Sequence, residues 1–377
     1  MTKPQNVLTT PHPKTLIVGI QARYNHTKNI EAYYDEFRNL LKTNEIKHDI
    51  EHFLKLREIH PKTFITLGKI EDIRKICKEH HIEEVYISEP LTTFQTKHLE
   101  DYFNCNVFDR TDLILEIFQK AAYTAEGKKQ VEIAALEHAK TRLAGKGIFL
   151  SQQQGGIGVR GGSGETLKER EIRHINLLIK GLKKQLGQIQ KTRDTQRKKR
   201  LSANIPHICL IGYTNAGKST ILNALTKADV LAEDKLFATL DTTTRELFIN
   251  AKKKGILSDT VGFIQYLPHK LVEAFKSTLS ELKYADLLLE VIDASDPDWI
   301  AHIEVVREIL DDLEIDKPIV YVFNKIDKLD EEEQEKLETL AAKHQPHIMV
   351  SAQSKTELTP LINFLAEWEP KKNNPSV

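Results

Sequence analysis

Apolar residues are spaced in two different ways along the chain, and the change comes near residue 110. Before it, short apolar runs alternate with helical patterns; the runs are TLIVGI at 15–20, TFITL at 63–67 and EVYI at 84–87. Buried strands joined by amphipathic helices are typical of a parallel sheet. The pattern predicts a small N-terminal α/β domain over residues 1–110.

Longer helical patterns follow. TDLILEIFQKAA begins at residue 111 and VEIAALEHAKTRL covers 131–143. Beyond a glycine-rich stretch, apolar residues recur every three or four positions, at Ile172, Ile175, Ile179, Leu182, Leu186 and Ile189. Such a heptad seam packs lengthwise against another helix. We expect a long antiparallel helical hairpin over residues 111–203, with 152–165 as its tip; dimerisation through the seam is the alternative.

Charge is balanced overall but not along the chain. The protein carries 54 Lys and Arg against 54 Asp and Glu, whereas residues 165–200 carry twelve Lys and Arg against four acids. Few aromatic residues lie among them, which suits the backbone of duplex or structured RNA better than stacking on single-stranded bases. The basic second helix of the hairpin is therefore expected to contact a polyanion.

Several other classes of protein are disfavoured. Cys77, Cys105 and Cys209 have no motif spacing, and an odd total does not suit a disulfide framework. The histidines are scattered, so a zinc site is not expected. The N-terminus lacks the apolar core of a signal peptide, and no apolar run reaches the roughly 18 residues of a membrane span. The composition predicts a cytoplasmic protein with no membrane span.

A phosphate-binding motif stands at residues 212–220. GYTNAGKST fits the pattern G-x-x-x-x-G-K-[ST] and follows HICLIG at 207–212, a buried-strand pattern. Backbone N–H groups of such a loop surround phosphate oxygens at a helix N-terminus. Lys218 is expected to contact the β- and γ-phosphates, and the Ser219 hydroxyl to bind Mg²⁺.

A second strand pattern, GILSDTVG at 255–262, contains a motif for magnesium and the γ-phosphate. Asp259 can hold Mg²⁺ through water, and the backbone N–H of Gly262 can reach the γ-phosphate. Phe263 follows, where many GTPases place a glutamine that orients the attacking water. An apolar ring cannot orient water, which is compatible with slow intrinsic hydrolysis and with help from a partner.

The motif expected to recognise the nucleotide base lies in PIVYVFNKID at 318–327. Asp327 can accept from N1–H and the 2-amino group of guanine, and Asn324 can address N7. Ala352, in VSAQS at 350–354, can donate its N–H to O6. Adenine lacks the two donors, so a buried Asp327 would be left unpaired beside it. Four motifs in this order predict a GTPase.

The segment LFATLDTTTR at 236–245 is the candidate switch between the first two motifs. One threonine here should complete the magnesium shell and sense the γ-phosphate. The residues alone leave Thr239, Thr242, Thr243 and Thr244 as candidates.

These motifs resemble those of the HflX family of ribosome-associated GTPases. The resemblance runs from about residue 105 to 327 and includes VFDRTDLILEIF, the GGIGVRG loop followed by GET, GYTNAGKST, LFATLD, DTVGFIQYLPHKLVEAFKSTL and NKID. In that family the threonine of F-A-T-L-D is the switch residue, which singles out Thr239. Where the family commonly reads R-G-P-G-E, this chain has RGGSGE at 160–165, one residue longer and without the stiffening proline.

The resemblance also implies a function. It implies binding to the large ribosomal subunit and its RNA, with Arg160 at the RNA-facing tip, and dissociation of stalled or idle ribosomes by a monomer. Asn215 is the residue type that related GTPases use to hold potassium, so we expect K⁺ to accelerate turnover. A large-subunit assembly GTPase and a GTP-controlled protein-binding switch acting through the heptad seam are the alternatives.

The expected fold is therefore α/β: a small N-terminal α/β domain, a long antiparallel helical hairpin, then a P-loop (Ras-like) GTPase domain at 204–370 and a tail at 371–377. Catalytic roles are expected for Lys218, Thr239 and Gly262, with Mg²⁺ held by Ser219, Thr239 and, through water, Asp259. The residues expected to bind GTP are Gly212, Tyr213, Thr214, Asn215, Ala216, Gly217, Lys218, Ser219, Phe237, Ala238, Thr239, Leu240, Asp241, Asp259, Thr260, Val261, Gly262, Asn324, Lys325, Ile326, Asp327, Ser351, Ala352 and Gln353.

Overall fold

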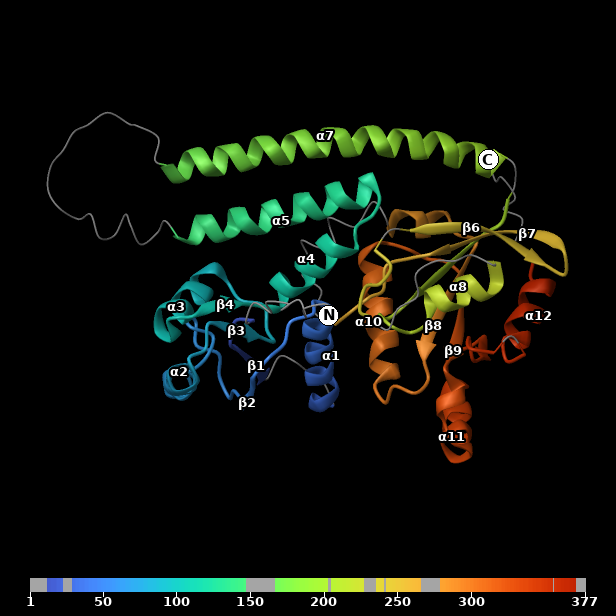
Figure 1. The fold of residues 1–377 in the computed structure, drawn as a ribbon. Coiled ribbons are helices and arrows are strands. Elements are labelled where there is room, and N and C mark those ends of the chain that lie inside the picture. Colours follow the sequence, from blue (N-terminus) through green and yellow to red (C-terminus); the bar gives the residue numbers. More distant parts are fainter. Residues whose placement is uncertain are drawn as a thin grey trace, which may run out of the picture. The chain divides into compact units, whose positions relative to one another are not determined.

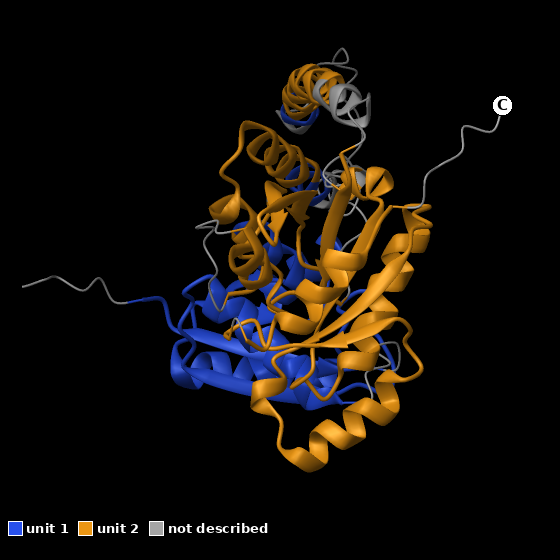
Figure 2. Cartoon of the chain, turned by 90° about the vertical axis from the view of Figure 1, so that its right-hand side faces the viewer, with its two compact units in different colours: residues 1–116, 138–172 blue, residues 117–137, 173–377 orange. Residues whose placement is uncertain are grey.

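The computed structural model describes residues 12–22, 29–146, 167–202, 205–226, 235–240, 242–265, 279–354 and 356–370. The expected tip loop with Arg160, the tail at 371–377 and Asp241 lie outside these ranges. The chain splits into two compact units, coloured separately in Figure 2: unit 1 comprises residues 1–116 and 138–172, and unit 2 comprises 117–137 and 173–377.

Unit 1 contains a four-stranded sheet in the order β2-β1-β3-β4, with all neighbouring strands parallel (Figure 1). Its strands are β1 Thr15–Gln21, β2 Ile50–Lys55, β3 Glu84–Ile87 and β4 Asn106–Phe108, and its helices include α1 Ile30–Thr43, α2 Leu67–His80 and α3 Thr93–Phe103. Ile70 and Ile73 of α2 and Leu99 of α3 pack with Leu16 and Val18 of β1 in one buried cluster. The predicted N-terminal α/β arrangement is confirmed.

The predicted strand at 63–67 is wrong. Phe64 has a left-handed φ of 62°, and the Thr63 hydroxyl donates to the Ile65 carbonyl at 2.7 Å, so the run forms a turn before α2 begins. The strand beside β1 is instead β2, with the sequence IEHFLK. Because β2 is an edge strand with charged residues among its apolar ones, it has no continuous apolar run.

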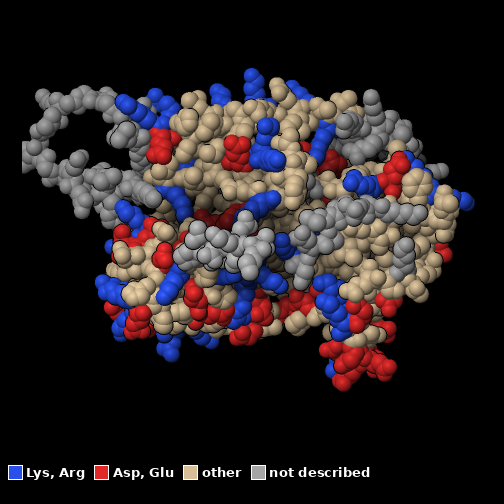
Figure 3. Space-filling view, in the orientation of Figure 1, with Lys and Arg blue, Asp and Glu red and all other residues tan. Residues whose placement is uncertain are grey.

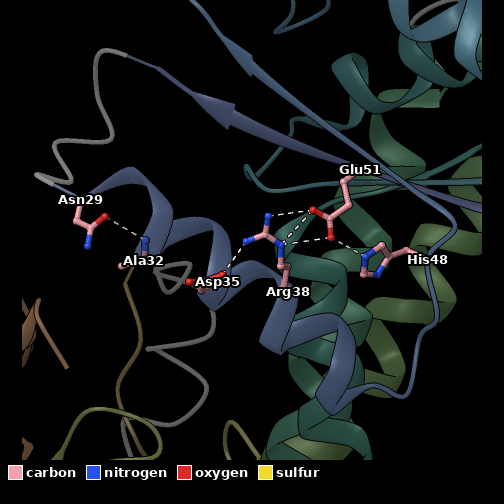
Figure 4. A network of polar contacts seen from close by, with 6 residues as sticks. All are labelled: Asn29, Ala32, Asp35, Arg38, His48 and Glu51. Carbon is pink, nitrogen blue, oxygen red and sulfur yellow. Dashed lines mark hydrogen bonds and ion pairs between the residues drawn. The ribbon is translucent and has the colours of Figure 1, made fainter. Parts of the chain in front are cut away.

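The edge strand β2 is linked to α1 by exposed polar side chains (Figure 4). Arg38 of α1 donates to Glu51 of β2, with the shortest contact at 2.9 Å, and to Asp35 one turn earlier at 2.7 Å. His48 lies 2.7 Å from the same Glu51 carboxylate. The Arg38 guanidinium lowers the pKa of Glu51, so this carboxylate stays ionised as the link between strand and helix.

The helices described after β4 include α4 Arg110–Ala121 and the longer α5 Ala125–Lys146 and α7 Leu167–Ser202. The heptad seam of α7 faces inward, because Ile175 and Ile179 are 7% and 8% exposed whereas Leu177, off the seam, is 62% exposed. No helix in the described ranges combines the length and apolar composition that crossing a membrane requires.

Within unit 2, α5 and α7 are joined by two ion pairs. Lys183 of α7 lies 2.8 Å from Glu137 of α5, and Arg193 of α7 lies 2.9 Å from Glu126. Arg193 comes after Lys183 in α7, whereas its partner Glu126 comes before Glu137 in α5. The two helices therefore run in opposite directions in this part of unit 2.

Unit 2 contains a six-stranded sheet in the order β10-β9-β8-β5-β7-β6, in which only the β6–β7 pair is antiparallel. Its strands are β5 His207–Gly212, β6 Thr243–Ile249, β7 Lys252–Asp259, β8 Leu287–Asp293, β9 Ile319–Asn324 and β10 His347–Met349. Its other elements include α8 Lys218–Thr226, η1 Ser280–Tyr284, α10 Trp299–Asp312, η2 Ile326–Lys328, α11 Glu331–Ala341 and α12 Thr359–Glu367.

Helices cover both faces of this sheet. α8 and α12 pack in a cluster with Leu210, Leu257 and Val322, whereas α10 packs with Ile211 and Leu288 from the opposite face. A sheet buried on both faces explains why β5, β8 and β9 read as continuous apolar runs. The predicted P-loop (Ras-like) domain is confirmed, and its motifs lie at the carboxyl ends of β5, β7, β8 and β9, where such sheets bind ligands.

Candidate nucleotide-binding site

The phosphate loop connects β5 to α8, and Lys218 is the first residue of α8. The Lys218 side chain is buried and folds back over the loop, so that Nζ donates to the carbonyls of Gly212 at 3.2 Å and Tyr213 at 2.7 Å. Burial lowers the pKa of Lys218 to about 8; nearby Asp259 opposes this shift and Lys325 adds to it. A buried ammonium at a helix N-terminus is a site for phosphate.

Gly217 allows the phosphate loop to touch the base-recognition motif. Its φ is +96°, and a Cβ on it would lie 2.2 Å from Nδ2 of Asn324. That amide nitrogen donates to the Ala216 carbonyl at 2.9 Å, and its Oδ1 accepts from the Ala352 N–H at 2.9 Å. Asn324 therefore braces the phosphate loop against Ala352, in the segment 350–354, from a buried position at the end of β9.

Three side chains meet beside the loop where magnesium is expected. Ser219 Oγ lies 2.6 Å from Asp259 Oδ2 and 2.7 Å from Thr239 Oγ1, and Thr239 also hydrogen-bonds Asp259. Thr244 instead lies 2.8 Å from Ser258. Of the candidate switch threonines, the geometry brings Thr239 to the site and commits Thr244 elsewhere.

The same group fits a hard divalent cation. Its atoms are two hydroxyl oxygens and a carboxylate, the ligand type that Mg²⁺ prefers. Asp259 Oδ1 and the Thr214 hydroxyl are buried and have no hydrogen-bond partner among the described residues, so both have capacity for a bound cation or phosphate. Burial raises the pKa of Asp259, while Lys218 and the two hydroxyls oppose the shift.

The segment after Asp259 is attached to the phosphate loop through its backbone. Phe263 N donates to the Gly212 carbonyl at 3.1 Å, and Thr214 N donates to the Phe263 carbonyl at 2.7 Å. A Cβ on Gly262 would lie 2.8 Å from Thr214 Cα, so only glycine fits there. Phe263 itself is 2% exposed and packs in the cluster under α10, which leaves its ring no part in holding water.

On the base-recognition side, Asp327 is exposed in η2, because the chain leaves the sheet at Lys325, which has a left-handed φ of 66°. The Ala352 N–H donates to Asn324. The expected contacts of Asp327 and Ala352 with guanine stay predictions. Lys325 Nζ lies 2.5 Å from Asp293 Oδ2, and this contact fixes the turn that carries Asp327.

Sequence reasoning missed one supporting contact, made by Asn324, and one supporting residue, Asp293. The bracing role of Asn324 depends on Ala216, more than a hundred positions away, and nothing in the sequence indicates that contact. Asp293 had a usable signal, because it ends the apolar strand LLLEVID as Asp259 ends β7. A polar residue at the carboxyl end of each parallel strand could have been assigned to this edge.

A cavity lies at the phosphate side of the site. Its lining contains expected residues from the first two motifs and from the switch segment, together with Lys235: Thr214, Asn215, Gly217, Lys218, Ser219, Thr220, Phe237, Ala238, Thr239 and Gly262. The structure thus brings together residues separated by up to 48 positions in sequence around one space. Asp241 lies outside the described residues.

Unit 1 holds another group of possible metal ligands, Asp109, Asp112 and His138. Its oxygens already have partners: Asp109 Oδ1 accepts from Asp112 N at 2.9 Å, and Asp112 Oδ2 accepts from Asp109 N at 3.0 Å. Asp112 also binds His138 and Arg142 of α5. This reciprocal arrangement caps the first turn of α4 and attaches α5 to it.

Three family models match successive parts of the chain. They are described as GTP-binding GTPase N-terminal at residues 31–119, GTP-binding GTPase middle region at 121–200 and 50S ribosome-binding GTPase at 207–325. GTPase HflX of Caldanaerobacter subterraneus is 46% identical over 312 residues, which are 82% of this chain and 71% of the relative. The chain belongs to the HflX family of GTPases.

Other HflX relatives agree. GTPase HflX of Magnetococcus marinus is 43% identical over 332 residues, 88% of this chain and 76% of the relative. The crystal structure of SsGBP with GDP is 26% identical with a TM-score of 0.51, covering 94% of this chain and 98% of that one. The expected family is confirmed, and as an HflX member this chain is a P-loop GTPase whose nucleotide chemistry uses Mg²⁺.

Proposed function

We propose that this GTPase binds the large ribosomal subunit and dissociates stalled or idle ribosomes in the cytoplasm, hydrolysing GTP to GDP and phosphate for its own release. The observation that carries the proposal is the surface of α7. Between residues 169 and 193 it exposes six basic side chains and two acidic ones. The exposed bases are Arg170, Arg173, Lys180, Lys183, Lys184 and Lys191, and Figure 3 shows Lys and Arg side chains along this helix.

The site residues have separate roles in this proposal. Lys218 would turn from the loop carbonyls to the β- and γ-phosphates, and the Gly262 N–H would donate to the γ-phosphate. Ser219, Thr239 and, through water, Asp259 would hold Mg²⁺, which when bound neutralises charge that develops on the phosphates. Because Phe263 is buried and apolar, the attacking water needs another group to orient it, in keeping with slow hydrolysis that a ribosomal partner accelerates.

A phosphate-rich partner is favoured over a protein partner that binds through the heptad seam. Ile175 and Ile179 are almost fully buried within the protein, so this part of the seam is already covered. The same burial supports a monomer rather than a dimer formed through the seam. Arg160 and the glycine-rich loop, which lie outside the described residues, stay a prediction as the RNA-facing tip.

Sedimentation with ribosomal particles tests this proposal. The protein should migrate with intact large subunits in the presence of a non-hydrolysable GTP analogue, and light scattering should report dissociation of the particles under the same conditions. Changing Lys180, Lys184 and Lys191 to Gln should weaken binding about tenfold or more and reduce its dependence on salt, because fewer phosphate contacts release fewer counterions.

The matched control changes three exposed lysines of unit 2 that lie outside α7, Lys252, Lys283 and Lys343, to Gln. These variants lose the same formal charge and should bind as the wild type does. Equal weakening in both sets would mean that net charge, rather than α7, controls association. Binding only to immature particles would favour the assembly GTPase, and no binding to any particle would overturn the proposal.

Potassium should accelerate GTP hydrolysis relative to sodium. Asn215, the residue expected to hold K⁺, lines the cavity with a left-handed φ of 61°. The variant Asn215→Gly tolerates that φ and removes the side-chain oxygen. For the wild type, turnover should be about tenfold or more faster in KCl than in NaCl at the same concentration, because K⁺ would add one contact that stabilises charge. For Asn215→Gly, turnover should be equal in the two salts. Equal wild-type rates in both salts would remove the idea.

A further inference from the structure

The switch segment contacts a helix that belongs to none of the four nucleotide motifs. Phe237, two residues before Thr239, meets Phe118 of α4 edge to face, with ring centroids 4.7 Å apart and planes at 82°. Both residues belong to unit 2, and their exposed fractions are 0% for Phe118 and 2% for Phe237. Perpendicular aromatic pairs at this distance attract each other beyond their buried area.

The backbone at Phe237 is unusual for such a side chain. Its φ is +56°, in the left-handed region that bulky residues rarely adopt. Such a conformation persists only where the surroundings fix it. The ring of Phe237 is buried, so its packing fixes the residue, and Phe118 is one of the groups that pack against it.

The position of Phe237 determines where Thr239 lies. A single residue, Ala238, separates them, and Leu240 on the other side is 2% exposed. Thr239 Oγ1 lies 2.7 Å from Ser219 Oγ and hydrogen-bonds Asp259. If the ring of Phe237 lost its contact, the backbone could relax to an ordinary φ, and the threonine hydroxyl would move with it. Displacements of about 1 Å in a catalytic group can cost a hundredfold in rate.

We propose that Phe118 is a positioning residue for GTP hydrolysis, which holds Phe237 and through it places Thr239 at the magnesium site. The inference rests on the role of Thr239 in the proposed function. Phe118 lies in a helix that precedes the GTPase sheet by about ninety residues. None of the four nucleotide motifs includes it.

Steady-state hydrolysis by the full-length protein tests this role. Phe118→Ala should lower kcat about tenfold and raise the Mg²⁺ concentration for half-maximal rate by a similar factor, because Thr239 acts only with magnesium and the γ-phosphate. Affinity for GDP should stay within about twofold, since GDP lacks the γ-phosphate that Thr239 senses. Phe118→Leu keeps most of the apolar volume and should recover part of the loss.

Phe364 provides the matched structural control. It lies in α12 and packs against the core of the same sheet, so Phe364→Ala removes an aromatic ring from unit 2 without touching the switch segment. Its kcat and Mg²⁺ requirement should equal those of the wild type. A double variant, Phe118→Ala with Phe237→Ala, should be no slower than Phe237→Ala alone, because both changes break one contact.

Two results would overturn the inference. One is a folded Phe118→Ala protein that keeps the wild-type kcat and Mg²⁺ requirement; the other is a double variant whose loss is the product of the two single losses. If Phe118→Ala does not fold, Phe118→Leu decides the question, with an expected loss of about threefold in kcat from the edge-to-face geometry. Failure of the wild type to bind ribosomal particles would count against the proposed function. It would not affect the test of Phe118, which depends on GTP hydrolysis rates of the protein without ribosomes.

Discussion

Replacing Gly217 by alanine is expected to weaken GTP and GDP binding at least about 100-fold. Two costs combine: the φ of +96° is strained for alanine, and the new Cβ would lie 2.2 Å from Asn324 Nδ2. The strain costs about 1 kcal/mol or more, and displacing a buried amide from its partners costs about 2 kcal/mol or more. Their sum, about 3 kcal/mol, corresponds to the stated loss of affinity.

Binding of a fluorescent guanine nucleotide measures this effect. Gly181→Ala is the matched control, because Gly181 lies on an exposed face of α7 and a Cβ there meets nothing within 4 Å. The control should bind nucleotide as the wild type does and unfold at the same temperature or slightly higher. A Kd for Gly217→Ala within about threefold of the wild type would show that the Asn324 brace does not support nucleotide binding.

Thr239→Ala should reduce the GTP hydrolysis rate about 100-fold, with GDP affinity changed less than about threefold. The hydroxyl of Thr239 lies 2.7 Å from Ser219 and bonds Asp259, the two other residues expected at the magnesium site. Removing one group that stabilises developing charge typically costs a hundredfold or more in rate. Single-turnover hydrolysis at saturating GTP separates this loss from any change in binding.

Thr244→Ala is the comparison that makes this result specific. Thr244 lies in β6, at the carboxyl end of the switch segment, and hydrogen-bonds Ser258, so its loss should cost about 1 kcal/mol of stability. Its hydrolysis rate should remain within about twofold of the wild type. A slow Thr244→Ala beside an unimpaired Thr239→Ala would mean that the switch threonine had been assigned to the wrong residue.

The fold was largely predictable where burial on both faces produces uniform apolar runs. β1, β3, β5 and β9 were recognised for this reason, and the heptad seam correctly separated buried Ile175 from exposed Leu177. The edge of the first sheet was not predictable in this way. There β2 mixes charged and apolar residues, whereas residues 63–65 of the apolar run are buried in a turn before α2. An apolar run indicates that the residues are buried, and a buried turn has the same apolar sequence pattern as a buried strand.

The candidate site was predictable as a set of motifs but not as a set of contacts. Spacing placed Lys218, Ser219 and Asp259 correctly in one region because phosphate loops and strand ends obey fixed geometry. The sequence predicted that Asn324 can address guanine N7, but it did not predict that the same amide connects the phosphate loop to Ala352. Contacts between residues far apart in sequence depend on the exact packing of loops, which no local pattern contains.

The separation of charge in unit 2 would affect how the protein approaches the polyanion that we propose as its partner. α7 carries the basic residues, α11 exposes the acidic group Glu331, Glu332, Glu333, Glu335 and Glu338, and the formal net charge is zero (Figure 3). Because its net charge is zero, the protein has no long-range electrostatic attraction to the polyanion. Its separated charges form an electric dipole, which the field of the polyanion orients. Electrostatics would therefore favour the orientation in which α7 faces the polyanion. Added salt would screen this preference, so that the protein would meet the polyanion in random orientations.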